Sequence, residues 1–294
     1  YTHAQLKQYD KAIDWFKKYS QVSPADANPH DSLGDLYYNL GKFDEALEKY
    51  QEALRIKPDF ESSYKVSYIY ALRGDFGQAK SWADRWAAAA PSNAGKAWAL
   101  LLNAIYLHLQ GQVGLSLRTL DDALRFAELD GALEVIDAVH RTRIWVAWEW
   151  GDYDLFLETA KKRYDFRAAR NYMGEARNRF VFGYYQALFD LKRRGPAAAA
   201  ERLAALEKTA PPSKAGPDAD VWTTGLEHVR AEILLAEGRP AEARQAFDKI
   251  RRTPVTILQA IMLVQRCVPY FHGLHGRSYA MEGRQDLAIA LYER

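Results

Sequence analysis

Residues that could carry out acid–base or metal chemistry are few and scattered in this chain. Of its seven histidines, only His272 and His275 lie close together, and they could share a metal ion on one helical turn. The sequence offers no third ligand, and Gly273 and Gly276 beside them favour a tight packing site instead. Cys267 has no base near it and is expected to be buried. The sequence therefore predicts no catalytic residues, no metal ligands and no cofactor.

A basic segment between residues 161 and 194 could contact an acidic partner or RNA. Its lysines and arginines are Lys161, Lys162, Arg163, Arg167, Arg170, Arg177, Arg179, Lys192, Arg193 and Arg194. Aromatic residues are interleaved with them, as in surfaces that bind single-stranded nucleic acid. The net charge of the whole chain is only +2, so we favour a solvated helix face and keep RNA binding as an alternative.

A short pattern recurs along the chain, in which a glycine precedes a small residue by five positions. It occurs at Gly41 and Ala46, Gly74 and Ala79, Gly111 and Ser116, Gly195 and Ala200, Gly238 and Ala243, and Gly283 and Ala288. Two variants complete the set: Gly151 precedes a bulky Phe156, and Lys7 replaces glycine before Ala12. Glycine suits a left-handed turn after a helix, and a small residue suits a close helix crossing. The pattern predicts eight helical hairpins.

The residues between 27 and 60 fix the type of hairpin. Leucine, glycine, tyrosine, alanine and proline stand there at Leu33, Gly34, Tyr37, Ala46, Tyr50, Ala53 and Pro58. This spacing resembles the tetratricopeptide repeat, a helix-turn-helix unit of about 34 residues. The resemblance implies an all-α fold, a right-handed α-solenoid of about eight such repeats.

The resemblance also implies one superhelical domain over residues 1–294. Repeats close to the consensus cover 1–93, longer divergent repeats cover 94–260, and a repeat-like hairpin covers 261–294, because the glycine spacing grows from 33 to 45 residues. Both ends fall inside predicted helices, so we expect the chain to be truncated at both ends. The proline-rich stretch 211–217 is the one clear loop.

Composition excludes several classes of protein. With 48% hydrophobic residues the chain is expected to fold, and a single cysteine rules out an intrachain disulfide. No apolar run reaches the length of about 20 residues that crosses a bilayer. We therefore expect no membrane span and a cytoplasmic location.

In tetratricopeptide arrays the first helix of each pair lines the inner, concave surface. The resemblance places positions 2, 3, 6, 10 and 13 residues before each turn glycine on that surface, and we call these the groove positions. The aromatic and arginine residues predicted to bind a peptide there are Tyr64, Tyr68, Trp98, Arg141, Trp145, Trp148, Phe182, Tyr185, Phe189 and Arg193. Such side chains are common binding anchors. The alternative is that these rings pack between repeats.

The groove positions of the earliest repeats are predicted to be acidic and polar, with Asp31 and Asp35 among them. Some members of the family hold a carboxylate terminus with lysine and asparagine. Here the matching positions hold these two aspartates, then Tyr64 and Tyr68, so an acidic tail is not the expected ligand.

The sequence thus predicts a non-catalytic scaffold that binds a protein or peptide segment, with no small-molecule substrate. Residues 238–250 and 283–294 are similar to repeats of large bacterial multidomain proteins, which suggests a regulatory or assembly module of a larger protein. Nucleic acid is not the expected partner. The alternatives are an RNA-binding module and an oligomerisation module that uses the terminal repeats.

Overall fold

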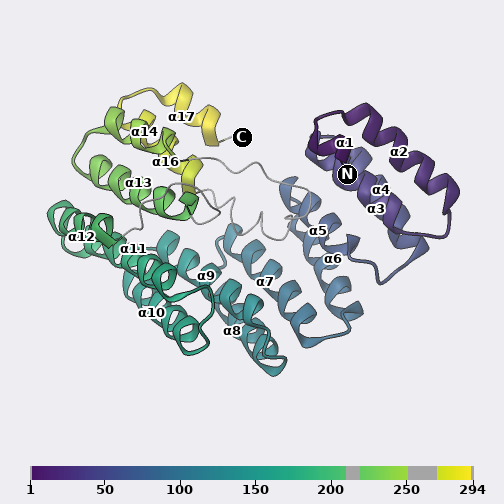
Figure 1. The fold of residues 1–294 in the computed structure, drawn as a ribbon, viewed down its shortest axis with the longest axis horizontal. Helices are drawn as coiled ribbons and strands as arrows, with labels where there is room; N and C mark the ends of the chain where they lie inside the picture. The colour runs from purple at the N-terminus through teal and green to yellow at the C-terminus, as the bar shows by residue number, and fades with distance from the viewer. Residues whose placement is uncertain (1, 210–218, 251–269, 293–294) are drawn as a thin grey trace. The chain divides into compact units, whose positions relative to one another are not determined.

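The computed structural model describes residues 2–209, 219–250 and 270–292, and these residues form sixteen helices with no strand among them (Figure 1). The first helices of the pairs are α1 (Thr2–Gln5), α3 (Asn28–Asn39), α5 (Ser62–Leu72), α7 (Asn93–Leu109), α9 (Leu133–Trp150), α11 (Glu175–Arg193), α13 (Ala219–Ala236) and α16 (Tyr270–Met281). The second helices are α2 (Tyr9–Val22), α4 (Phe43–Ile56), α6 (Phe76–Ala89), α8 (Val113–Leu129), α10 (Tyr153–Ala169), α12 (Pro196–Thr209), α14 (Pro240–Asp248) and α17 (Gln285–Tyr292). The predicted all-α fold of eight helix-turn-helix repeats is confirmed.

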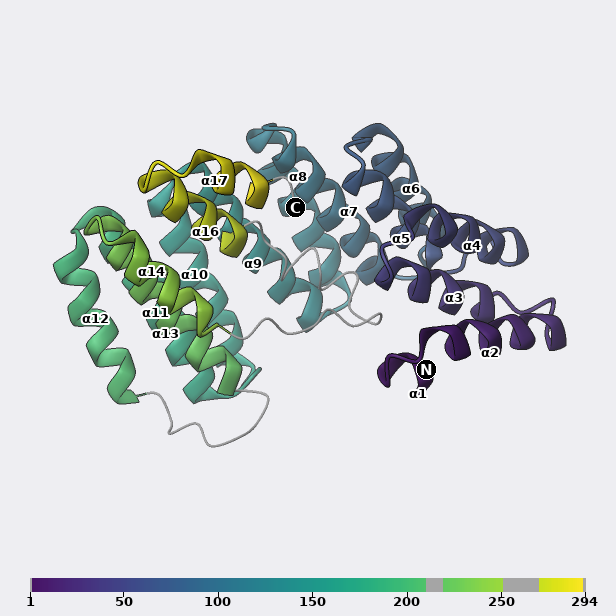
Figure 2. The ribbon, with the colours of Figure 1, turned by 90° about the horizontal axis from the view of Figure 1, so that it is seen from above.

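The two helices of a pair pack against each other. A first helix also packs against the second helix of the preceding pair in α2–α3, α4–α5, α6–α7, α10–α11, α12–α13 and α14–α16. In both ribbon views the two helices of a pair lie side by side (Figures 1 and 2). The described helices divide into two compact units within α9: unit 1 extends to Val139 and unit 2 begins at His140. The predicted loop at 211–217, Cys267 and the side chain of His272 lie outside what the structure describes.

The turn residue of each hairpin adopts the left-handed conformation that the pattern predicts. The φ angles of the seven turn glycines lie between 72° and 95°. They are Gly41, Gly74, Gly111, Gly151, Gly195, Gly238 and Gly283. Lys7 has φ 59° in the first hairpin, so lysine takes the place of glycine there, as predicted.

The small residue of the pattern is buried where the second helix crosses its neighbours. Exposure is 0–2% at Ala12, Ala46, Ala79, Ser116, Ala243 and Ala288, and Phe156 is also fully buried. The prediction of Ala200 was wrong, because the buried residue is Ala199 and Ala200 is exposed. The reason is a shorter turn: α12 begins directly after Gly195, whereas α4 begins two residues after Gly41.

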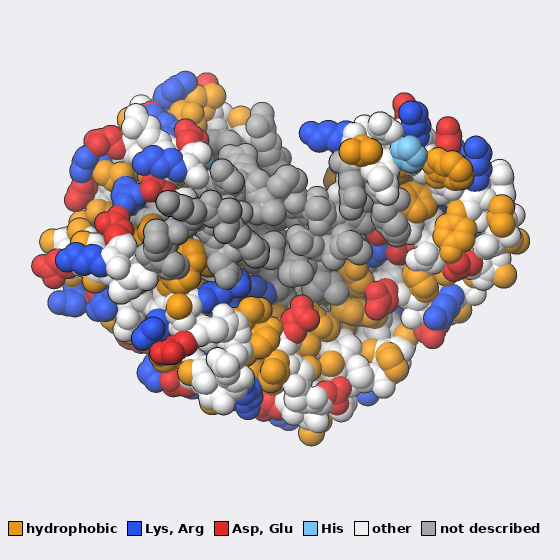
Figure 3. Space-filling view, viewed as in Figure 1, with side chains coloured by type: hydrophobic (Ala, Val, Ile, Leu, Met, Phe, Trp, Pro, Cys, Tyr) orange, Lys and Arg blue, Asp and Glu red, His pale blue; other side chains and the backbone are white. Residues whose placement is uncertain are grey.

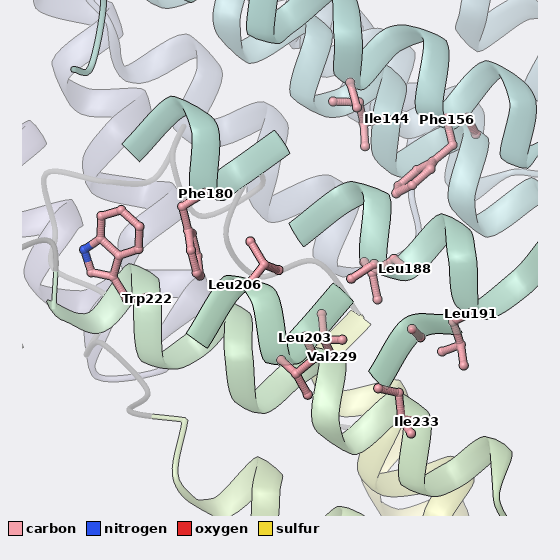
Figure 4. Close-up of a cluster of buried hydrophobic side chains, with 14 residues drawn as sticks. Ile144, Phe156, Phe180, Leu188, Leu191, Leu203, Leu206, Trp222, Val229 and Ile233 are labelled. Atoms are coloured by element: carbon pink, nitrogen blue, oxygen red, sulfur yellow. The ribbon is translucent and has the colours of Figure 1, made fainter. Parts of the chain in front are cut away.

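The hydrophobic core of unit 2 joins α9 to α13 (Figure 4). The ring of Phe180 on α11 lies edge-on against Trp222 on α13, with centroids 4.3 Å apart. Gly183 on the same helix lies under Leu206 of α12, so close that a methyl group on Gly183 would come within 2.5 Å of the leucine. The middle repeats thus use longer helices, such as the 19-residue α11, and still stack closely.

Candidate functional site

The groove positions of unit 1 carry aromatic side chains that are only partly buried. Tyr64 and Tyr68 lie on α5 and Trp98 lies on α7, and each is half-buried. The rings have neighbours on one side. Tyr64 lies 5.2 Å from Trp86 of α6, and Tyr68 lies 6.1 Å from Tyr38 of α3, between ring centroids. Each ring keeps only a part of its surface exposed.

Two leucines extend this apolar character along the same helices. Leu72 ends α5 and Leu109 ends α7, each two residues before its turn glycine, and they are 49% and 48% exposed. We call Tyr64, Tyr68, Leu72, Trp98 and Leu109 the apolar strip of unit 1. It offers hydrophobic surface that this chain does not itself bury.

The prediction of an acidic face on the earliest repeats was wrong. Asp31 and Asp35 are buried under Lys65, whose ammonium donates to a carboxylate oxygen of each at 2.7 Å. The hydroxyl of Ser62 donates to Asp31 at 2.6 Å and that of Tyr50 donates to Asp35 at 2.7 Å. The sequence pattern placed both aspartates correctly on α3 but did not reveal a lysine on the next hairpin.

In unit 2, four of the predicted rings pack against the core. Trp148 lies 5.2 Å from Phe156, and Tyr185 lies edge-on to the same ring at 5.5 Å. Phe182 stacks on a tyrosine of α10 at 5.1 Å, and Phe189 packs against the same core. All four are half-buried, so each has a packing role. Their predicted role as binding anchors stays a prediction.

The other three predicted residues of unit 2 lie in different surroundings. Trp145 is half-buried on α9, one turn before Glu149. Arg141 is half-buried on the same helix. Arg193 is exposed and donates to Asp154 of α10 at 2.5 Å. Its guanidinium is thus already paired with a carboxylate on the second helix of the preceding hairpin.

The structure adds three groove-position residues that the sequence analysis did not name. His228 and Glu232 stand 10 and 6 residues before Gly238, and Arg277 stands 6 before Gly283. Arg277 donates to Glu232 at 2.5 Å, and the hydroxyl of Tyr184 lies 2.7 Å from Nδ1 of His228. Applying the same offsets to the last two repeats would have found them.

The surroundings of His228 in unit 2 keep its imidazole ring neutral. Burial, together with the nearby positive charges of Arg277 and Lys192, lowers the pKa of His228 to about 3. The ammonium of Lys192 lies 5.1 Å from the ring of Trp148. Burial raises the pKa of Glu149, although the nearby indole of Trp145 and the charge of Arg277 act in the opposite direction.

The basic segment 161–194 does not present its cations as one exposed face. Five of them are paired with carboxylates, in Lys161–Asp165, Lys162–Glu158, Arg179–Glu175, Arg193–Asp154 and Arg194–Asp190. Arg163 and Arg167 are buried. Basic and acidic side chains are interspersed on the face shown in Figure 3. These pairings weaken the argument for RNA binding.

Neither a metal-binding cluster nor a membrane-spanning helix is found in the described part of the chain. Within it, no three histidine, cysteine, aspartate or glutamate residues come together in a way that could hold a metal ion. Nor is any described helix both long enough and apolar enough to span a bilayer.

Comparisons with known proteins agree with this geometry. A family model described as "TPR repeat" matches residues 34–64, and one described as "Tetratricopeptide repeat" matches residues 226–249. The chain is a tetratricopeptide-type helical-repeat protein. The first match covers the α3–α4 hairpin and the second covers the α13–α14 turn, so the same repeat type occurs in both units.

Solved structures share the fold of this tetratricopeptide-type protein. A tetratricopeptide repeat protein from Parabacteroides merdae aligns with a TM-score of 0.57 and 15% identity, over 90% of this chain and 96% of that one. The apo form of RapI aligns with a TM-score of 0.54 and 13% identity, over 90% and 94%. At these identities the likeness concerns the fold alone.

Sequence relatives match only in short regions. The human protein O-mannosyl-transferase TMTC1 is 33% identical over 79 residues, which are 26% of this chain and 9% of that protein. The small glutamine-rich tetratricopeptide repeat-containing protein 2 of Mycosarcoma maydis is 33% identical over 58 residues, 20% of this chain and 16% of that protein. The chain thus matches less than a fifth of either relative. Stacked tetratricopeptide repeats form a protein-interaction scaffold, and proteins of this family are generally non-catalytic.

Proposed function

We propose that this chain binds a segment of a partner protein at the groove positions of its first helices and catalyses no reaction. The observation that carries the proposal is the apolar strip of unit 1, whose five side chains are left partly or largely exposed. Burying apolar surface stabilises a complex by roughly 25 cal/mol per Å². The proposed partner therefore supplies hydrophobic side chains.

The charges next to the strip favour the same kind of partner. Asp31, Asp35 and Lys65 are buried and bonded to one another, so they offer little to a charged ligand. The ends of α5 and α7 carry the exposed Leu72 and Leu109, and the cation that follows Leu72, Arg73, is paired with Asp44. An extended or helical segment with apolar side chains fits this strip better than an acidic tail.

For unit 2 we propose that only a few of the predicted residues contact a partner directly. Trp145 and Arg141 are half-buried groove-position residues that could contact the partner directly. Trp148, Phe182, Tyr185, Phe189 and Arg193 would act mainly by supporting the surface, because each already has contacts within unit 2. We further propose that the chain serves as a regulatory or assembly module in the cytoplasm.

Selection of peptides from a random library tests the proposal. The chain is used as bait, and each selected peptide is then tested against Tyr68→Ala and Trp98→Ala variants. Trp15→Ala is the matched control, because Trp15 is an exposed tryptophan of the same unit on a second helix, α2. We expect apolar peptides that lose binding to the two strip variants and keep it with the control. Peptides that bind both strip variants as tightly as the parent chain would contradict the proposal.

A second candidate function is oligomerisation through the first hairpin. Tyr19 and Val22 lie along one face of α2 and are 39% and 83% exposed. A stripe of this kind is a common feature of protein interfaces. Sedimentation of the chain and of a Val22→Asp variant over a range of concentrations tests it, and a parent chain that remains monomeric would exclude it.

A further inference from the structure

The buried network between α3, α4 and α5 contains one negative charge more than it contains positive charges. Asp31 and Asp35 contribute two carboxylates and Lys65 contributes one ammonium, and each residue is less than 9% exposed. The network joins two hairpins, because both aspartates lie on α3 and the lysine lies on α5. Among the described residues no other charged group contacts either carboxylate.

Two carboxylates that share one cation away from water cannot both ionise freely. Burial disfavours the charged form of a carboxylate, and a like charge nearby disfavours it further. Burial and the charge of Asp31 raise the pKa of Asp35, Lys65 and the hydroxyl of Tyr50 lower it, and the net pKa is about 6. Asp35 therefore changes its charge close to neutral pH.

We infer that this network is a proton-sensitive joint between the second and third hairpins, tighter when Asp35 carries a proton and weaker when Asp35 is ionised. The proton removes the excess charge and leaves one carboxylate facing one ammonium. The hydrogen bond from Tyr50 and the contact with Lys65 remain available to the protonated form, since a neutral carboxyl still accepts hydrogen bonds.

Lys65, Tyr50 and Tyr64 near Asp35 keep their own charge states through this range. Burial lowers the pKa of Lys65, but Asp31 and Asp35 raise it by more, so its ammonium stays charged. Burial raises the pKa of Tyr50 far above its usual value and that of Tyr64 to about 12, so both hydroxyls stay neutral. Asp35 is the group in this set whose titration falls near pH 6.

The direction of the pH effect follows from these values. The pKa of Asp35 is higher in the fold than the value of about 3.9 expected for an unfolded chain. The stabilisation that protonated Asp35 contributes is therefore complete only below about pH 3.9, and this stabilisation is lost as the pH rises through about 6. Between pH 5 and pH 8 the opening equilibrium of the joint should change by about tenfold in favour of opening.

Hydrogen exchange of the α5 backbone amides can measure this opening. The parent chain is compared with Asp35→Asn, which cannot titrate, at pH 5 and pH 8. Asp44→Asn is the matched control, because Asp44 also bridges the two hairpins but pairs with Arg73 at the surface. We expect the ratio of opening constants between parent and Asp35→Asn to change about tenfold over this range, and the ratio for the control to stay constant.

A carboxyl ¹³C titration of the parent chain provides a second readout that needs no variant to fold. A midpoint for Asp35 near pH 6 supports the inference. A midpoint at or below about 3.9, or an exchange ratio for Asp35→Asn that does not change with pH, would overturn it.

Discussion

Replacing Gly34 with alanine tests how the second hairpin is packed. Gly34 lies in α3 against the ring of Tyr50, and an added methyl carbon would lie 2.6 Å from two ring carbons. Carbon atoms in contact normally stay about 3.5–4.0 Å apart, so the ring would have to move by about 1 Å. Tyr50 is 2% exposed, and its hydroxyl is held by Asp35 at 2.7 Å. The ring therefore has little room to move.

The expected loss of stability follows from two opposing effects. Overpacking a core costs about 1–3 kcal/mol, and disturbing the Tyr50–Asp35 hydrogen bond adds about 1 kcal/mol. Alanine is a better helix former than glycine, and this difference offsets about 1 kcal/mol of the lost stability. The free energy of unfolding should therefore fall by about 2 kcal/mol in Gly34→Ala.

Urea unfolding of the parent chain and of matched variants measures this change. Gly114→Ala is the control, because Gly114 lies in the first turn of α8 and only the tip of Arg118 comes near its added methyl group, at 3.9 Å. This control should be neutral or slightly stabilising. A Gly34→Ala, Tyr50→Leu double variant should lose less than the sum of its single changes, because the smaller leucine makes room for the methyl group. If Gly34→Ala proves as stable as the control, the packing described for this hairpin is wrong.

Three further predictions concern charge and backbone conformation. Lys65→Met leaves two buried carboxylates without a cation and should lower the free energy of unfolding by about 3–5 kcal/mol. Lys49→Met, at a partly exposed ion pair of α4, should lower it by less than about 1 kcal/mol. An equal loss in both variants would argue against the buried network. The ring of His228 should not titrate between pH 4.5 and 8 by NMR, because burial keeps it neutral; a midpoint near 6.5 would contradict this. Lys7→Gly should raise the free energy of unfolding by about 1 kcal/mol by relieving the left-handed backbone at φ 59°, and an unchanged or lower value would speak against strain there.

The hairpins could be predicted from the sequence because their determinants are local. A left-handed turn after a helix needs glycine or a tolerated substitute such as Lys7, and a close crossing needs a small residue such as Ala46. Both requirements operate within a few residues, so they leave a visible pattern. The position of Ala199 was missed because the turn after Gly195 is one residue shorter than the others.

The chemistry of the groove positions depends on residues from other hairpins, so it could not be predicted in the same way. Asp31 and Asp35 look like surface acids until Lys65, 34 and 30 residues later, covers both. Tyr185 looks like a binding anchor until Phe156 of the preceding hairpin packs against it. Periodicity gives the face of a helix on which a side chain lies, but the side chains of the next helix decide whether that face stays exposed.

The dissociation constant of one selected peptide for three chains tests the central claim most directly. The chains are the parent, Trp98→Ala on α7, and Trp15→Ala on α2 as the control. An anchor residue of an interface contributes about 2 kcal/mol or more, so we predict binding at least about 30-fold weaker for Trp98→Ala and unchanged for Trp15→Ala. Equal dissociation constants for the parent and a correctly folded Trp98→Ala chain would contradict binding at the groove positions of the first helices.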